Sequence, residues 1–317
     1  MWSCRPTPRR GEWQRRSSED CQPGPYVQHD IIDYRRFIGR TPLSMSASKE
    51  TSRASYPSLT LGTAHFHATH PAIIAPLMGT SRQQILAQAE SMRQHPDSSA
   101  VSVIEWRVDF YRKHGQPLKV ATVYQELIEL FDSVPVLATL RTSAEGGQAA
   151  ISDETYLEVV TALASTPGAI VIDVETARTT AREALQQLQA NQVAAVGSYH
   201  DFEQTPSTFD ILDRLQSMGR EGYDLAKIAV TPTSPADVIR INEATYQAAS
   251  VLAQPVITVA MGPLGIGSRL AGGVFGSAAT FASLEAASAP GQIPVHLVAE
   301  VAQAIYSETR NLKESAP

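Results

Sequence analysis

The sequence predicts an α/β protein whose main domain is a (β/α)8 TIM barrel, and three observations support this fold. Eight short runs rich in apolar and β-branched residues alternate with amphipathic stretches from residue 72 onward. The runs are continuously apolar, which is typical of parallel strands that are buried on both faces. The number of these units and the length of chain they occupy match a (β/α)8 barrel.

The expected elements alternate along the chain. Strands are expected at 72–78, 101–106, 135–140, 169–174, 193–199, 225–230, 255–260 and 276–281. Helices are expected at 81–93, 118–131, 153–165, 176–191, 206–218, 235–252 and 295–307. Ser152 before Asp153 and Ser234 before Pro235 are good helix N-cap arrangements. The run 56–66 is expected to form a short N-terminal hairpin that closes the barrel floor.

An open doubly wound sheet is the rival fold, because it shows the same alternation. Such a sheet usually carries a glycine-rich GxGxxG turn after its first strand. The residues that follow the first expected strand, Gly79-Thr80-Ser81, lack this pattern. The closed barrel is therefore favoured.

Residues 1–56 are expected to be a disordered, basic N-terminal extension. This segment combines Arg-Arg pairs, such as Arg9-Arg10 and Arg15-Arg16, with many Ser, Pro, Gln and Gly residues, and its low hydrophobicity cannot offset the entropy lost on ordering. It could also be upstream sequence that is not translated, with Met45 as the working start, an organelle transit peptide or a nucleic-acid-binding arm. The catalytic barrel is expected at 57–310 and a C-terminal tail at 311–317.

Composition excludes several classes of protein. Residues 1–68 carry ten basic and six acidic residues, which leaves 16 basic and 26 acidic residues, a net charge of −10, in the remainder. An acidic body argues against a nucleic-acid partner, and no apolar run approaches the roughly 20 residues of a membrane span. Cys4 and Cys21 both precede the barrel, so a reducing, cytoplasmic setting is expected. No Cys/His cluster has zinc-ligand spacing, so no metal is expected.

Polar residues gather where the expected strands end, and in such barrels the carboxyl ends of the strands form the active site. The residues that the strands deliver there include Glu105, Arg107, Asp109, Arg141, Glu145, Asp173, Glu175, His200, Lys227, Arg269, Ser288 and Gln292. Arginines and carboxylates at a barrel rim often pair with each other, so each of these also has a structural interpretation.

Lys227 and His200 indicate the chemistry. Lys227 stands inside an apolar strand, where burial lowers the pKa of its ammonium group and favours the neutral amine that attacks a ketone to form an imine. A lysine that reaches out of the strand to a carboxylate is the structural alternative. His200 ends the neighbouring strand and is the natural general base, although a capped structural histidine would look the same in the sequence.

Seven motifs resemble those of type I 3-dehydroquinate dehydratase. They are EWRVD (105–109), RTSAEGG (141–147), HDF (200–202), KIAVTP (227–232), SRLAG (268–272), FGSAATF (275–281) and SAPGQ (288–292). They occur in order, each at the expected barrel position, and the resemblance covers residues 58–309.

The resemblance implies that the protein is a lyase that dehydrates 3-dehydroquinate to 3-dehydroshikimate, in the shikimate pathway or in quinate breakdown. It implies that Lys227 forms the imine, that His200 moves protons and that Glu145 orients His200. Arg269 would bind the substrate carboxylate and a closing loop would supply Ser288 and Gln292. By the same likeness, Glu105, Arg107 and Arg141 would hold the ring hydroxyls. No cofactor is implied, and the resemblance suggests a homodimer.

One departure and two alternatives accompany this interpretation. Some family members contact the substrate with a serine on the first strand, but here Pro76 occupies that position and has neither a hydroxyl nor an N–H donor. A non-catalytic quinate-pathway sensor on the same barrel would not need both Lys227 and His200. Another Schiff-base barrel enzyme, such as an aldolase, would not need Arg269 together with the loop at 288–292.

Overall fold

The computed structural model describes residues 56–284, 288–289 and 291–314. The chain divides into two units, Met1–Thr51 and Ser52–Pro317, and every described residue belongs to the second. The predicted extension at 1–56 falls, except for Tyr56, outside the described residues. Its disorder and the domain boundaries at 56 and 310 therefore stay predictions.

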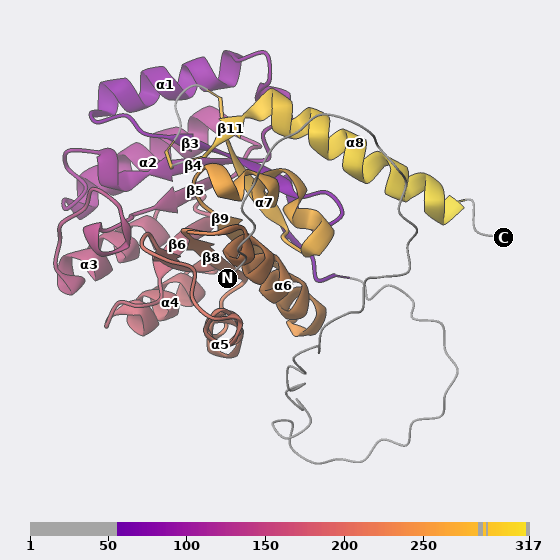
Figure 1. The fold of residues 1–317 in the computed structure, drawn as a ribbon. Helices are drawn as coiled ribbons and strands as arrows, with labels where there is room; N and C mark the ends of the chain where they lie inside the picture. Colours follow the sequence, from indigo (N-terminus) through magenta and orange to yellow (C-terminus); the bar gives the residue numbers. More distant parts are fainter. Residues whose placement is uncertain (1–55, 285–287, 290, 315–317) are drawn as a thin grey trace, which may run out of the picture. The chain divides into compact units, whose positions relative to one another are not determined.

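Parallel strands in chain order form the centre of this unit (Figure 1). They are β3 (Ala72–Leu77), β4 (Val103–Arg107), β5 (Val136–Thr139), β6 (Val171–Glu175), β7 (Ala194–Asp201), β8 (Leu225–Val230), β9 (Val256–Ala260) and β10 (Ala279–Ser283). β10 pairs with β3, and a parallel bridge between Val256 and Ser277 joins β9 to the start of β10. The strands therefore close into a ring, which confirms the barrel over the open sheet.

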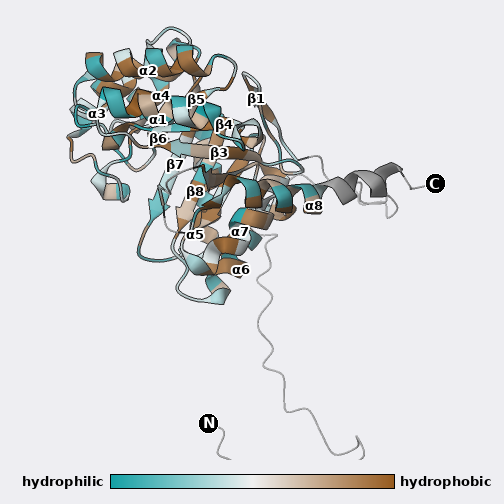
Figure 2. Ribbon diagram, turned by 90° about the horizontal axis from the view of Figure 1, so that it is seen from above, coloured by the Kyte–Doolittle hydropathy of each residue, from teal (hydrophilic) through white to brown (hydrophobic). Residues whose placement is uncertain are grey.

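Amphipathic helices surround the strands (Figure 1). They are α1 (Arg82–Gln94), α2 (Pro117–Phe131), α3 (Asp153–Ala164), α4 (Ala181–Ala190), α5 (Thr208–Glu221), α6 (Pro235–Val251) and α8 (Val295–Glu314). Helices such as α2 and α6 carry both hydrophilic and hydrophobic stretches (Figure 2). The predicted caps are present: Ser152 accepts from the Thr155 amide, and Ser234 forms a capping box with Asp237.

A hairpin closes the floor of the barrel, as predicted. β1 (Leu59–Leu61) pairs antiparallel with β2 (Ala64–Phe66). Phe66 is 2% exposed and belongs to a core cluster with residues near the amino ends of the strands, including Ile74, Val103 and Val171. The amino-terminal end of the barrel is therefore filled by apolar side chains, which leaves the carboxyl end for polar groups.

The structure differs from the expected elements in several places. The helix expected at 176–191 begins only at Ala181, and the strand expected at 276–281 runs from Ala279 to Ser283. A short helix, α7 (Ile266–Ala271), follows β9 at a place where no helix was expected. A two-residue strand, β11 (Ile293–Pro294), pairs with β10. β7 continues to Asp201, so His200 lies within a strand rather than after it. The cause is the neighbouring strand, because β8 keeps pairing with β7 up to Val230 opposite Asp201.

No helix within the described ranges is both long enough and apolar enough to cross a membrane.

Candidate active site

A cavity of about 150 Å³ opens at the carboxyl ends of the strands. The nine site residues predicted from the sequence all line it: Glu105, Arg107, Arg141, Glu145, His200, Lys227, Arg269, Ser288 and Gln292. Other lining residues, which include Thr139, Phe202, Met261 and Phe281, were not predicted as site residues, although Phe202 and Phe281 belong to two of the quoted motifs. The barrel thus brings together side chains that are up to 187 positions apart, from Glu105 to Gln292, in the sequence.

Lys227 lies on β8 with its side chain in the barrel interior, where the residue is only 5% exposed. Its Nζ atom is 3.5 Å from Asp173 Oδ2 and 3.8 Å from Glu105 Oε1. It also lies 4.5 Å from the centre of the Phe281 ring. Burial lowers the pKa of Lys227, although the two carboxylates oppose that shift. The neutral, nucleophilic amine is therefore more accessible than for an exposed lysine.

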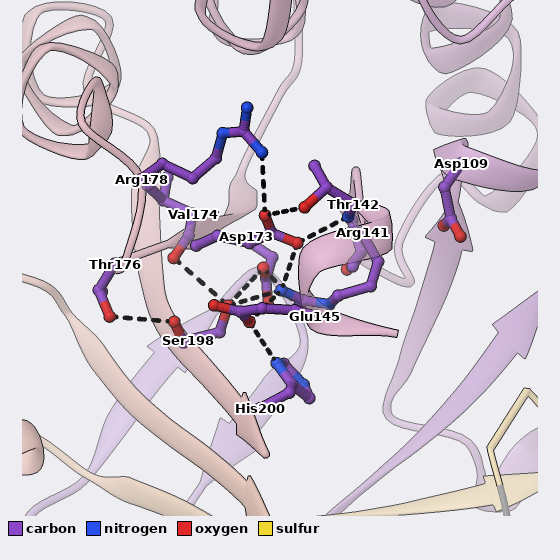
Figure 3. Close-up of polar contacts among 12 residues, drawn as sticks. Asp109, Arg141, Thr142, Glu145, Asp173, Val174, Thr176, Arg178, Ser198 and His200 are labelled. Carbon is purple, nitrogen blue, oxygen red and sulfur yellow. Dashed lines mark hydrogen bonds and ion pairs between the residues drawn. The ribbon is translucent and has the colours of Figure 1, made fainter. Parts of the chain in front are cut away.

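His200 is paired with Glu145 at the same rim (Figure 3). The distance between His200 Nδ1 and Glu145 Oε2 is 2.8 Å. Burial and the nearby cations Arg141 and Lys227 hold the pKa of His200 well below 6.5. Burial raises the pKa of Glu145 to about 8, against the pull of Arg141. The imidazole is therefore neutral near pH 7, and its Nε2 atom is free to accept a proton once Glu145 is ionised and accepts from Nδ1–H.

Arg141 is the centre of a buried ionic network (Figure 3). Its Nη2 atom donates to Asp173 Oδ1 at 2.8 Å. Its Nη1 atom donates to Glu175 Oε1 at 3.1 Å and to Glu145 Oε2 at 3.2 Å. Ser198 Oγ accepts from Arg141 and donates to Asp173. One guanidinium group thus fixes three carboxylates, two from β6 and one from the short turn that follows β5.

Gly146 and Gly147 allow the motif at 141–147, which follows β5, to form a tight turn. Glu145 ends a short 3-10 turn, and Gly146 follows it in the left-handed region at φ 74°. A side chain at Gly146 would collide with the ring of Phe202, and one at Gly147 with the backbone of Arg141. The glycines therefore let the turn fold tightly and hold Glu145 against His200.

A second arginine, Arg107, ends the neighbouring strand β4 at the same rim. Arg107 donates from Nε and Nη2 to the two carboxylate oxygens of Asp109, both at 2.9 Å. Arg107 also approaches the carbonyl of Ser288 at 3.4 Å. Ser288 and Gln292 bond to each other, amide to side-chain carbonyl and side-chain amide to hydroxyl. These contacts place the predicted loop residues over the cavity.

Arg269 comes from α7, the short helix that follows β9. It is 3% exposed and its backbone carbonyl accepts from the Thr280 hydroxyl at 2.8 Å. Burial lowers the pKa of Arg269 to about 10, so the group stays cationic near neutral pH. A buried guanidinium group at a cavity wall is well suited to bind a carboxylate.

Pro76 stands opposite Glu105 across β3 and β4 and is not one of the residues that line the cavity. Glu105 instead accepts a hydrogen bond from Thr139 Oγ1 at 3.0 Å. Among the described residues, no group of three or more His, Cys, Asp or Glu side chains is arranged to hold a metal ion.

Comparison with protein families gives an extended match. The model of the type I 3-dehydroquinase family matches residues 73–309. The 3-dehydroquinate dehydratase of Listeria monocytogenes serotype 4b is 37% identical over 240 residues, which cover 75% of this chain and 94% of the relative. The enzyme of the same name from Lactiplantibacillus plantarum is 38% identical over 242 residues, with 75% and 93% covered.

Solved structures show the same relationship. The type I 3-dehydroquinate dehydratase of Clostridium difficile, determined with covalently modified comenic acid, superposes with a TM-score of 0.75 at 31% identity and covers 80% of this chain and 99% of its own. The 3-dehydroquinate dehydratase of Geobacillus kaustophilus also gives a TM-score of 0.75, at 33% identity, with 80% and 98% covered.

Proposed function

The chain belongs to the type I 3-dehydroquinase family, and on that premise we propose that it removes water from 3-dehydroquinate to form 3-dehydroshikimate through an imine on Lys227. The observation that carries the proposal is the pairing of a buried lysine with a neutral histidine in one cavity, beside a buried arginine. Each of these groups has a separate task in the reaction.

Lys227 is the nucleophile. The lone pair of its neutral Nζ attacks the ketone carbon, and the carbonyl oxygen, once protonated, leaves as water. The product is a protonated imine in which the nitrogen carries one hydrogen and a positive charge. This cation withdraws electrons from the adjacent carbon, whose proton then becomes removable.

His200 is the proton carrier. Its imidazole takes the proton from the carbon next to the imine, and the electrons move toward nitrogen to give an enamine. The enamine then expels the hydroxyl group two carbons from the imine, and that oxygen takes the proton back from His200 as it leaves as water. Hydrolysis of the conjugated imine releases 3-dehydroshikimate and restores the Lys227 amine. Glu145 keeps the imidazole oriented through the 2.8 Å contact.

The remaining residues position the ring. Arg269 binds the substrate carboxylate, and its burial strengthens that charge-assisted bond. Glu105, Arg107 and Arg141 face the cavity and hold the ring hydroxyls, with Ser288 and Gln292 on the loop side. The homodimer, the cytoplasmic location and the choice between biosynthesis and quinate breakdown stay predictions.

Absorbance tests the proposed function directly. Addition of 3-dehydroquinate to the protein is expected to raise ultraviolet absorbance as the conjugated enone of 3-dehydroshikimate forms. Lys227→Met is expected to abolish this signal. A wild-type protein that binds 3-dehydroquinate without producing the absorbance would instead support a sensor, and turnover that persists in Lys227→Met would exclude the imine mechanism.

A further inference from the structure

One oxygen atom beside Lys227 lacks a hydrogen-bond partner. Asp173 is fully buried, and its Oδ1 atom accepts from Arg141 at 2.8 Å and from Ser198 at 2.7 Å. Its Oδ2 atom has no hydrogen-bond partner within the described part of the chain. Buried polar atoms are nearly always paired, so an unpaired one calls for an explanation in terms of function. Lys227 Nζ lies 3.5 Å from Oδ2.

The two carboxylates beside Lys227 differ in what else they do. Glu105 lines the cavity and already accepts from the Thr139 hydroxyl, so its oxygens are placed to meet substrate. Asp173 is not among the lining residues, and it approaches Nζ from within the barrel wall. Arg141 and Ser198 hold Asp173 from the other side, so its position does not depend on substrate.

Imine formation changes what Nζ can offer. An ammonium group carries three N–H donors, whereas the protonated imine carries one and keeps the positive charge. A single donor needs one well-placed acceptor, and Asp173 Oδ2 is the closer and the unpaired one. The change from amine to imine therefore leaves Asp173 with the partner that it lacks.

We propose, building on the imine chemistry above, that Asp173 is the counter-ion that keeps the imine on Lys227 protonated during dehydration. The imine accepts electrons from the adjacent carbon only while its nitrogen is protonated. A fixed carboxylate beside that nitrogen raises the affinity of the imine for its proton. Asp173 does this through Lys227 without touching the substrate, so it is a positioning residue.

The charges around Lys227 favour this assignment. Asp173 and Glu105 stabilise a cation at Nζ, whereas Arg141 and Arg107 oppose it. Glu145 and His200 also sense the charge of Lys227 from their side of the cavity. The strand partner on β9 is Ile257, and Phe281 on β10 faces Nζ with its ring. Asp173 is thus the nearer of the two carboxylates that pair with Nζ.

The test is the pH dependence of Asp173→Asn, which removes the charge and keeps the shape. With 3-dehydroquinate and borohydride, the acid limb of imine trapping at Lys227 is expected to move to lower pH by about one to three units. The alkaline limb of turnover is expected to move in the same direction, because the imine loses its proton more easily. If the pH profiles of imine trapping and of turnover in Asp173→Asn coincide with those of the wild type, the proposal is overturned.

Glu175→Gln is the matched control. Glu175 lies two positions along the same strand, binds the same guanidinium group and carries the same charge, but its ion pairs go to Arg141 and Arg178. In Glu175→Gln, the acid limb of imine trapping and the alkaline limb of turnover are expected to stay at the wild-type pH. An equal shift in both variants would show that any buried charge in this network has the same effect, and it would overturn the proposal. Wild-type protein that is not modified at Lys227 would instead refute the proposed function itself.

A measurement on the wild type covers the case in which Asp173→Asn does not fold. In a crystal structure of the borohydride-free imine complex, Nζ is expected within about 3 Å of Asp173 Oδ2. An imine nitrogen that bonds to Glu105, or to neither carboxylate, would overturn the proposal.

Discussion

Replacement of Arg141 by methionine would remove the one cation that three buried carboxylates share. Arg141 is 4% exposed, and its contacts with Asp173, Glu175 and Glu145 span 2.8–3.2 Å. Loss of one partner from a buried ion pair costs about 3–5 kcal/mol, because the other charge stays buried and unpaired. Methionine fills most of the space, so the cost is electrostatic rather than a cavity effect.

The free energy needed to protonate Asp173 gives an independent estimate of the stability lost when Arg141 is removed. In the wild type, the pKa of Asp173 lies below 3.8, because Arg141, Lys227 and Ser198 outweigh its burial. Without Arg141, the buried Asp173 carboxylate takes up a proton in the folded protein and becomes neutral. At pH 7 that protonation costs about 4 kcal/mol relative to the unfolded chain, at 1.36 kcal/mol per pH unit.

The sign of the pH dependence follows. The folded-state pKa of Asp173 becomes raised in the variant, so the variant gains stability as pH falls from that pKa toward 3.8. The wild-type pKa is depressed, so Asp173 stays ionised between pH 7 and pH 5 and contributes no change there. The difference in the free energy of unfolding between the wild type and Arg141→Met is therefore expected to shrink by about 3 kcal/mol when the pH is lowered from 7 to 5.

Urea unfolding followed by circular dichroism measures this gap at each pH. Arg82→Met is the control, because Arg82 forms a short pair with Glu126, 2.6 Å long, at the surface, where its side chain is 58% exposed. The control is expected to change stability little and without a trend in pH. A similar loss in both variants, or a gap for Arg141→Met that does not narrow toward pH 5, would refute the reasoning.

Three further predictions concern activity. His200→Asn is expected to leave imine trapping intact and to lower kcat by about 100- to 10,000-fold; a near-normal rate would remove His200 as the base. The pKa of Glu145, about 8, predicts that kcat rises with pH through that value as the carboxylate forms beside the imidazole. Glu145→Gln is expected to abolish this rise of kcat with pH. A rise that persists in the variant would show that a group other than Glu145 titrates. Arg269→Gln is expected to lower kcat/KM by about 10- to 100-fold, mainly through KM, and an unchanged KM would show that the substrate carboxylate binds elsewhere.

The barrel was predictable from the sequence because its signals are local. Each buried strand is a short apolar run, and each helix carries a cap or a periodic apolar face. α7 was missed because six residues that follow Gly262 and Gly265 show neither signal. The extension of β7 to Asp201 was missed for a different reason, since the pairing with β8 determines it.

The candidate site was predictable as a set of positions but not as a network. Strand ends converge in a parallel barrel, so all nine predicted residues meet at one cavity. Asp173 and Glu175 were placed at the same rim, and their alternation with Val174 points both side chains to one face. Their shared bond to Arg141, however, depends on contacts between strands that no local pattern encodes.

Mass spectrometry of the borohydride-treated protein tests the central claim, that Lys227 holds the substrate as an imine. Wild-type protein incubated with 3-dehydroquinate and borohydride is expected to gain the mass of one reduced adduct, located on the peptide that contains Lys227. His200→Asn is expected to gain it as well, and Lys227→Met is not. An active wild-type protein with an unmodified Lys227, or with the adduct on another lysine, would contradict the account.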